Sequence, residues 1–158
     1  MLERVCRIIM REVVFSPAAV FSRTILIAAD SAFSRRILEE MMHDSTVYQP
    51  IVAMNSAEAL EIASIIKPHL FLFDYHMTDI NGIELYDKLH ARKGLRTIPA
   101  IIMSTELPKG EIERRNILGI EKPFHPNILF RMIEGIIQST QHELTIHHRA
   151  NTTLLSLV

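Results

Sequence analysis

A short, unbroken apolar run in the middle of the chain constrains the fold more than any other feature. Residues 70–73 are all large and apolar, and Asp74 follows them directly. A strand of this composition has both faces buried, which is typical of a parallel sheet covered by helices on each side. Ligands and reactive groups collect beyond the carboxyl ends of such strands. The carboxylate of Asp74 therefore stands where a functional group is expected.

Strand and helix patterns alternate along the whole chain. Strands are expected at residues 24–29, 47–53, 70–73, 99–103 and 119–121. Helices are expected at residues 35–43, 56–66, 83–90, 109–118 and from 127 onward. The alternation predicts an α/β fold with a doubly wound, five-stranded parallel sheet and right-handed crossovers. Asp30 or Ser31 can cap the first helix. Pro50 indicates an edge or a bulge in the second strand. Arg35 and Arg36 are expected on an exposed helix face.

Polar side chains stand at the ends of four expected strands, on one edge of the sheet. Asp30, Asp74, Ser104 and Lys122 end the first, third, fourth and fifth strands respectively. Two carboxylates in close range repel each other unless a cation or a proton lies between them. Oxygen ligands with open coordination positions suit Mg²⁺. An anionic nucleophile, a hard cation, a lysine and a hydroxyl together are what phosphoryl transfer needs.

Over residues 23–138 the chain resembles the receiver domain of two-component response regulators. The resemblance is carried by Ile25-Leu-Ile-Ala-Ala-Asp30-Ser, Asp74-x-x-Met77-x-x-x-x-Gly82, Ile98-Pro-Ala-Ile-Ile-Met-Ser104 and Glu121-Lys122-Pro123-Phe124. It implies a flavodoxin-like (βα)5 fold with strand order 2-1-3-4-5. Residues 1–22 would then be a partly helical N-terminal extension, and residues 139–158 would extend the last helix and end in a tail.

The resemblance also implies a role for each residue at the sheet edge. Asp74 would be the phosphoacceptor, Ser104 would hydrogen-bond the phosphoryl oxygen, and Lys122 would pair with it. Asp30, Asp74 and the backbone carbonyl of His76 would be ligands of Mg²⁺. The peptide bond between Lys122 and Pro123 would be cis.

A chain of this family would be a signalling protein and not an enzyme. The resemblance implies a stand-alone regulator in a phosphorelay, which takes its phosphoryl group from a sensor histidine kinase or a phosphotransfer protein and contacts a downstream signalling protein.

The net charge of −1 gives no long-range attraction for nucleic acid or an anionic membrane, and no apolar segment is long enough to span a bilayer. The single cysteine fits the cytoplasm, and apolar stripes in both extensions suggest a possible homodimer.

Several departures from the family pattern bear on function. Ala29 replaces the first acid of the usual pair, which predicts weaker Mg²⁺ binding. Gly119 occupies the place of an aromatic residue that, in the family, couples the hydroxyl residue to the output surface. The interval from Ser104 to Lys122 is also short, so the intervening helix or strand must be short. These departures leave open a degenerate receiver that binds proteins or dimerises without phosphorylation. A nucleotide or flavin binder of the same sheet order is disfavoured, because no glycine-rich loop follows the first strand.

Overall fold

The computed structural model describes residues 3, 6–7, 23–29, 31–43 and 47–139, which belong to two compact units divided between Phe124 and His125. The first unit holds a parallel sheet in the order β2-β1-β3-β4-β5. Its strands are β1 (Arg23–Ala28), β2 (Tyr48–Ala53), β3 (Leu70–Asp74), β4 (Ala100–Ser104) and β5 (Leu118–Glu121). The predicted flavodoxin-like sheet with strand order 2-1-3-4-5 is therefore confirmed.

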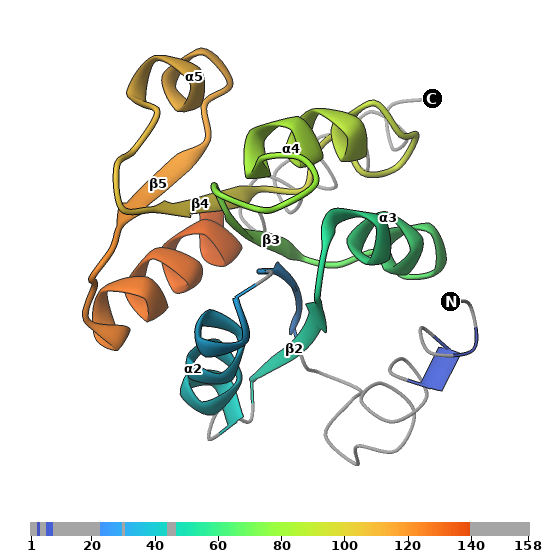
Figure 1. The fold of residues 1–158 in the computed structure, drawn as a ribbon, viewed down its shortest axis with the longest axis horizontal. Coiled ribbons are helices and arrows are strands. Elements are labelled where there is room, and N and C mark those ends of the chain that lie inside the picture. The colour runs from blue at the N-terminus through green and yellow to red at the C-terminus, as the bar shows by residue number, and fades with distance from the viewer. Residues whose placement is uncertain (1–2, 4–5, 8–22, 30, 44–46, 140–158) are drawn as a thin grey trace, which may run out of the picture. The chain divides into compact units, whose positions relative to one another are not determined.

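Helices connect these strands and cover the sheet. They are α2 (Ala32–His43), α3 (Ser56–Ile65), α4 (Gly82–His90) and α5 (Lys109–Arg114). Helix α2 lies on one face of the sheet, while α3 and α4 lie side by side on the other (Figure 1). The second unit contains a helix over residues 126–139, in which Leu129, Ile133 and Ile137 are buried at helical spacing.

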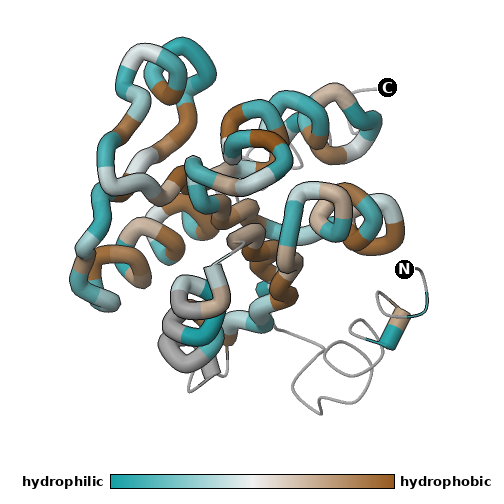
Figure 2. The backbone as a smooth tube through the Cα atoms, viewed as in Figure 1, coloured by the Kyte–Doolittle hydropathy of each residue, from teal (hydrophilic) through white to brown (hydrophobic). Residues whose placement is uncertain are grey.

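The central strands form the core because both of their faces are apolar. Every residue of β3 and β4 is buried, and the hydrophobic residues gather along the middle of the sheet (Figure 2). The rings of Phe71 and Phe73, on one face of β3, stack with their centroids 5.2 Å apart. This buried centre fixes the register of β3, so that Asp74 must emerge at the carboxyl edge of the sheet.

Short polar residues begin α2, α3 and α4. The hydroxyl of Ser31 accepts a hydrogen bond from the Ser34 backbone nitrogen at 3.4 Å, and Asn55 caps α3 by accepting from Glu58 at 2.8 Å. Asn81 and Glu84 form a reciprocal capping box at the start of α4. Pro50 lies in β2, which is an edge strand, as predicted.

Two predicted helix boundaries were wrong. Helix α2 begins at Ala32, three residues earlier than predicted, because Ser31 caps it. The predicted helix 109–118 ends at Arg114, and Leu118 instead pairs with Ile101 as the first residue of β5. The backbone of Asn116 has a φ of 53°, a left-handed conformation that cannot continue a helix.

Several predictions fall on residues outside the described ranges. These are most of the N-terminal extension over residues 1–22, of which only residues 3 and 6–7 are described, the extension beyond residue 139, and the position of Asp30. Within the described ranges, no helix combines the length and the apolar composition needed to cross a bilayer.

Candidate functional site

Asp74 and Lys122 meet at the carboxyl edge of the sheet. Asp74 ends β3 and is only 4% exposed, and Oδ1 of its carboxylate accepts a hydrogen bond from Nζ of Lys122. Lys122 follows β5, and its backbone nitrogen donates to the Ser104 carbonyl at 2.7 Å. The pairing of β5 with β4 thus places Lys122 beside Asp74. The Lys122-Pro123 peptide bond is cis, as predicted from the resemblance.

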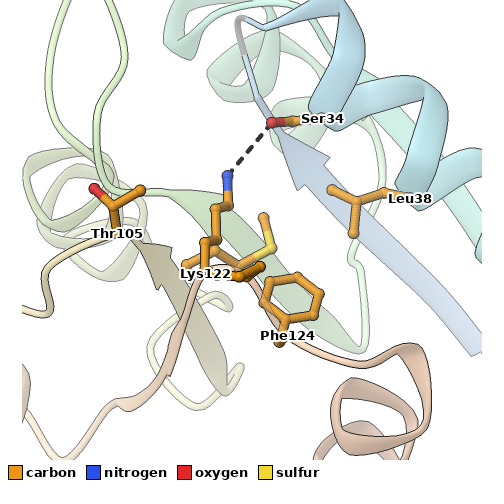
Figure 3. A pocket seen from close by; sticks show the side chains of 7 residues that line it. Ser34, Leu38, Thr105, Lys122 and Phe124 are labelled. Atoms are coloured by element: carbon orange, nitrogen blue, oxygen red, sulfur yellow. Dashed lines mark hydrogen bonds between the residues drawn. The ribbon is translucent and has the colours of Figure 1, made fainter.

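Lys122 also lines a pocket. Its Nζ lies 3.4 Å from the hydroxyl of Ser34 on α2, and the side chain crosses between α2 and β4 (Figure 3). The pocket has a volume of about 390 Å³ and is lined by Ser34, Leu38, Met103, Thr105, Lys122, Pro123 and Phe124. Its walls are mainly apolar, so the ammonium of Lys122 is held between a buried carboxylate and a largely apolar hollow.

Ser104 is placed at the same edge, but its hydroxyl is engaged elsewhere. The residue ends β4 and is 2% exposed. Its Oγ donates to the carbonyl oxygen of Glu106 at 2.6 Å and accepts from the Glu106 backbone nitrogen at 3.2 Å. The hydroxyl therefore holds the first turn of the β4–α5 loop in this structure.

The loop after Asp74 returns to the strand at Gly82. The backbone nitrogen of Gly82 donates to the carbonyl of Tyr75 at 2.9 Å. A Cβ atom at Gly82 would lie 2.5 Å from the carbonyl oxygen of Asp74, well inside van der Waals contact. Glycine is required here because α4 begins directly against the backbone of the acidic residue.

Asp79 anchors the middle of this loop to the start of α3. Its Oδ2 accepts hydrogen bonds from the hydroxyl of Ser56 and, at 3.2 Å, from the Ser56 backbone nitrogen. Burial alone would raise the pKa of Asp79, but the hydrogen bonds from Ser56 and from the backbone of Ile80 outweigh it and lower the pKa. The anchored loop carries His76, whose ring is exposed and lies edge-on to Tyr75 with centroids 4.8 Å apart.

The donors proposed for Mg²⁺ are only partly described. Asp74 and the His76 backbone offer oxygen atoms, the ligand type that Mg²⁺ prefers. Asp30 lies outside the described residues, and within the described ranges no three His, Cys, Asp or Glu side chains gather as a metal site. Ala29 is fully buried and brings no carboxylate to the end of β1. The oxygen set fits Mg²⁺ in kind, with fewer acids than the family pattern supplies.

Some neighbours of the site were not recognised in the sequence. Ser34 lies just before the helix expected at residues 35–43 and was not predicted as a site residue. In the structure it lies on α2 one turn before Leu38, and that spacing could have placed both beside Lys122. Glu106 contributes through its backbone, which no sequence pattern reveals. The expectation that Arg35 lies on an exposed helix face was incomplete, because its Nη1 donates to the carbonyl of Ala29 at 2.8 Å.

A doubly wound sheet with a buried aspartate and a lysine at its carboxyl edge defines a receiver-like α/β protein. The sequence model of the response regulator receiver domain matches residues 25–134, which is more than half of the chain. The chain belongs to this family, the receiver domains of two-component systems.

Relatives and solved structures agree with this assignment. The chain is 26% identical to the chemotaxis protein CheY1 of Helicobacter pylori over 118 residues, 72% of this chain and 95% of that protein. It is 27% identical over 99 residues to the polar-differentiation response regulator DivK of Brucella anthropi, covering 63% of this chain and 80% of that protein. The structure of chemotaxis protein CheY4 from Vibrio cholerae superposes with a TM-score of 0.68 at 23% identity, covering 73% of this chain and 98% of that one, which shows the shared fold.

Proposed function

We propose that this receiver domain accepts a phosphoryl group on Asp74 from a phosphohistidine of a sensor histidine kinase or phosphotransfer protein. The phosphorylated domain then signals through protein–protein contacts in a phosphorelay. The observation that carries the proposal is the buried carboxylate of Asp74 paired with the ammonium of Lys122 at the open edge of the sheet. The similarity to the chemotaxis protein CheY1, of which the match spans 95%, supports a signalling role for the domain.

The proposed chemistry is one in-line displacement. A carboxylate oxygen of Asp74 attacks the phosphorus, an O–P bond forms, and the P–N bond to the donor imidazole breaks. The bonding electron pair stays on the imidazole nitrogen. Because the other ring nitrogen of the donor phosphohistidine carries a proton, the imidazole leaves as a neutral ring. Negative charge on the equatorial oxygens is offset by the ammonium of Lys122 and by a hydrogen bond from Ser104.

Mg²⁺ fits this proposal as the cofactor. Asp30, Asp74 and the backbone carbonyl of His76 would hold it, and when bound it would neutralise part of the charge on the phosphoryl oxygens. Ala29 supplies no second acid, so we expect weaker binding than in receivers with an acid at that position. The buried carboxylate of Asp74 and the loop that Asp79 anchors support these ligand assignments.

The partners and location follow from the same proposal. A kinase or phosphotransfer protein would deliver the phosphoryl group, and a downstream protein would recognise the phosphorylated form, with the whole relay in the cytoplasm. A homodimer and the domain boundaries at residues 22 and 138 stay predictions, since the extensions lie largely outside the described residues.

Labelling by a small phosphodonor tests the proposal directly. The full chain is incubated with Mg²⁺ and phosphoramidate, and intact mass is recorded. We expect the mass to rise by one phosphoryl group in the unchanged protein and in Asp87→Asn, a surface acid on α4, but not in Asp74→Asn. Labelling that persists in Asp74→Asn would assign the acceptor elsewhere.

The degenerate receiver is the second candidate function, and two observations favour it. Ala29 stands in place of an acid at the end of β1, and Gly119 leaves no side chain on β5 at the position of the family's aromatic residue. In that case the domain would bind a protein partner or dimerise without phosphorylation. An unlabelled protein at every Mg²⁺ concentration would favour this second function.

A further inference from the structure

The pocket that Lys122 lines has a polar end and an apolar body. Its volume of about 390 Å³ lies within the usual range of small-molecule sites in proteins. Leu38 on α2 and Met103 on β4 are buried, Phe124 is half-buried, and these three form most of the apolar wall. The polar atoms at the other end come from Lys122 and Ser34. Figure 3 shows the ammonium pointing toward Ser34, while Leu38 and Phe124 lie to one side of this pair.

The polar end of the pocket offers hydrogen-bond donors and a positive charge. The ammonium of Lys122 has three N–H groups and no acceptor. One N–H donates to Asp74, and another faces the hydroxyl oxygen of Ser34 at 3.4 Å. In the described part of the chain, the hydroxyl proton of Ser34 has no acceptor of its own. Thr105 is exposed and adds a hydroxyl that can also donate. The group that fits this end is therefore an acceptor with a negative charge.

A molecule in the pocket meets the ammonium directly and the carboxylate of Asp74 only behind it. Asp74 is 4% exposed and does not line the pocket, whereas Lys122 does. A cationic head group would be repelled by Lys122, and a neutral one would make only the weaker kind of hydrogen bond. An apolar body would leave water against Leu38, Met103 and Phe124, which favours binding in proportion to the area covered.

We propose that this pocket binds a small monocarboxylate with an apolar body, such as a medium-chain aliphatic acid. The carboxylate accepts hydrogen bonds from the ammonium of Lys122 and the hydroxyl of Ser34. The aliphatic body lies against Leu38, Met103 and Phe124. This inference goes beyond the proposed function, because the ligand is bound as a free small molecule and no phosphoryl group on Asp74 is needed.

Titration of the full chain with octanoate tests the site. The methionine methyl groups are labelled with ¹³C, and the signal of Met103 is identified by its absence in Met103→Leu. We expect this signal to shift and saturate with a dissociation constant of about 1 mM or lower, an ordinary affinity for a ligand of about ten non-hydrogen atoms. Octanamide has the same body without the charge and should bind roughly tenfold more weakly. Acetate has the head group without the body and should give no saturable shift over the same concentrations.

Three variants assign the two donors. Lys122→Met removes the ammonium, so octanoate and octanamide should then bind with equal affinity. Ser34→Ala removes one hydrogen bond and should weaken octanoate binding by between about twofold and tenfold. Ser64→Ala is the matched control for the loss of a hydroxyl, because Ser64 is exposed on α3, outside the pocket, and donates to the carbonyl of Glu61 at 2.6 Å. It should leave the affinity for octanoate as in the unchanged protein.

The outcomes that overturn the proposal are distinct. A Met103 signal that octanoate does not move shows that the pocket takes no such ligand. Equal binding of octanoate and octanamide to the unchanged protein shows that the ammonium does not select a carboxylate, and this comparison decides even if Lys122→Met fails to fold. Similar shifts of all methionine signals mean general detergent-like binding, which also overturns the site. Labelling by phosphoramidate is a separate measurement, so either the site or the proposed function can fail while the other stands.

Discussion

At the scale of single residues, the backbone at Gly82 packs directly against the backbone of Asp74. Helix α4 starts so close to β3 that a methyl group at residue 82 would meet the carbonyl oxygen of Asp74 at 2.5 Å and the Cβ of Phe73 at 3.3 Å. Neither atom can move freely, because one belongs to the backbone of a central strand and the other to the core.

Gly82→Ala should therefore destabilise the protein. We expect a loss of about 1–3 kcal/mol in the free energy of unfolding, as is typical when atoms are forced into a packed region. Urea unfolding followed by circular dichroism measures it. Gly110→Ala on α5 is the control, since a Cβ there meets nothing within 4 Å, and it should be neutral or stabilise by up to about 1 kcal/mol. Equal effects of both changes would show that residue 82 does not approach the carbonyl oxygen of Asp74 this closely.

The ion pair of Asp74 and Lys122 is the second feature at this scale. The acid side chain is 6% exposed and the lysine side chain 26%, so water screens the pair only partly. Removing one charge from a pair in such a place costs more than the pair contributes in total, because the remaining charge keeps its desolvation penalty.

A double-mutant cycle tests this coupling. Lys122→Met should lower the free energy of unfolding by about 1–3 kcal/mol, and the same change made in Asp74→Asn should cost less. The expected coupling energy is about 1 kcal/mol or more, measured by urea unfolding at neutral pH. Strictly additive effects would mean that the two groups do not interact in solution.

At the scale of elements, α4 is tied to the sheet and to α5 by its last turns. His90 places its two ring nitrogens 3.1 Å from the carbonyl oxygen of Tyr86 and 2.9 Å from that of Ile98, just before β4. Asp87 receives two parallel hydrogen bonds from Arg115, at 2.8 and 2.7 Å, just after α5. The link between Asp87 and Arg115 holds α5 in place, although that short helix buries only Ile112.

The Asp87–Arg115 link should make stability depend on acid pH. Hydrogen bonds from Arg115 lower the pKa of Asp87 below its ordinary value of 3.8, although burial opposes the shift. The pKa of Asp87 is lower in the folded than in the unfolded protein. The link with Arg115 therefore stabilises the fold fully when the pH is above the ordinary pKa of Asp87, and this stabilisation is lost as the pH falls through the pKa of the folded state. Since the pair is exposed, we expect less than about 1 kcal/mol.

Arg115→Gln should therefore be less stable than the unchanged protein at pH 7, and this difference should shrink below about pH 4. Urea unfolding at a series of pH values measures it. Glu111→Gln is the control, because Glu111 lies 3.8 Å from Arg115 and should have a smaller effect. A difference that persists unchanged at low pH would exclude the carboxylate of Asp87 as its source.

At the scale of the whole molecule, the parallel sheet and its carboxyl edge could be predicted from the alternating strand and helix patterns, while the strand order came from the resemblance to receiver domains. Apolar runs that end in Asp74 or Ser104 define buried parallel strands, and parallel strands bring their carboxyl ends to one edge. The direction of the Ser104 hydroxyl could not be predicted, because it is decided by a backbone acceptor in the next loop.

The wrong predictions for α5 and Arg35 also concern features that leave no pattern in the sequence. The end of α5 was placed four residues too late because Leu118 continues an apolar pattern, while the left-handed backbone of Asn116 that stops the helix leaves no signal in composition. Arg35 was assigned to the surface because charged residues are usually exposed, yet its guanidinium reaches back to a carbonyl at the end of β1.

The bond between Lys122 and Asp74 joins positions 48 residues apart, and the contact of Lys122 with Ser34 joins positions 88 apart. During synthesis the ribosome releases α2 and β3 well before the lysine. A nascent chain that extends only through β4 therefore has the acid without this cation. The proposed phosphorylation site is completed only when β5 docks, so a product truncated after β4 should gain no phosphoryl group from phosphoramidate.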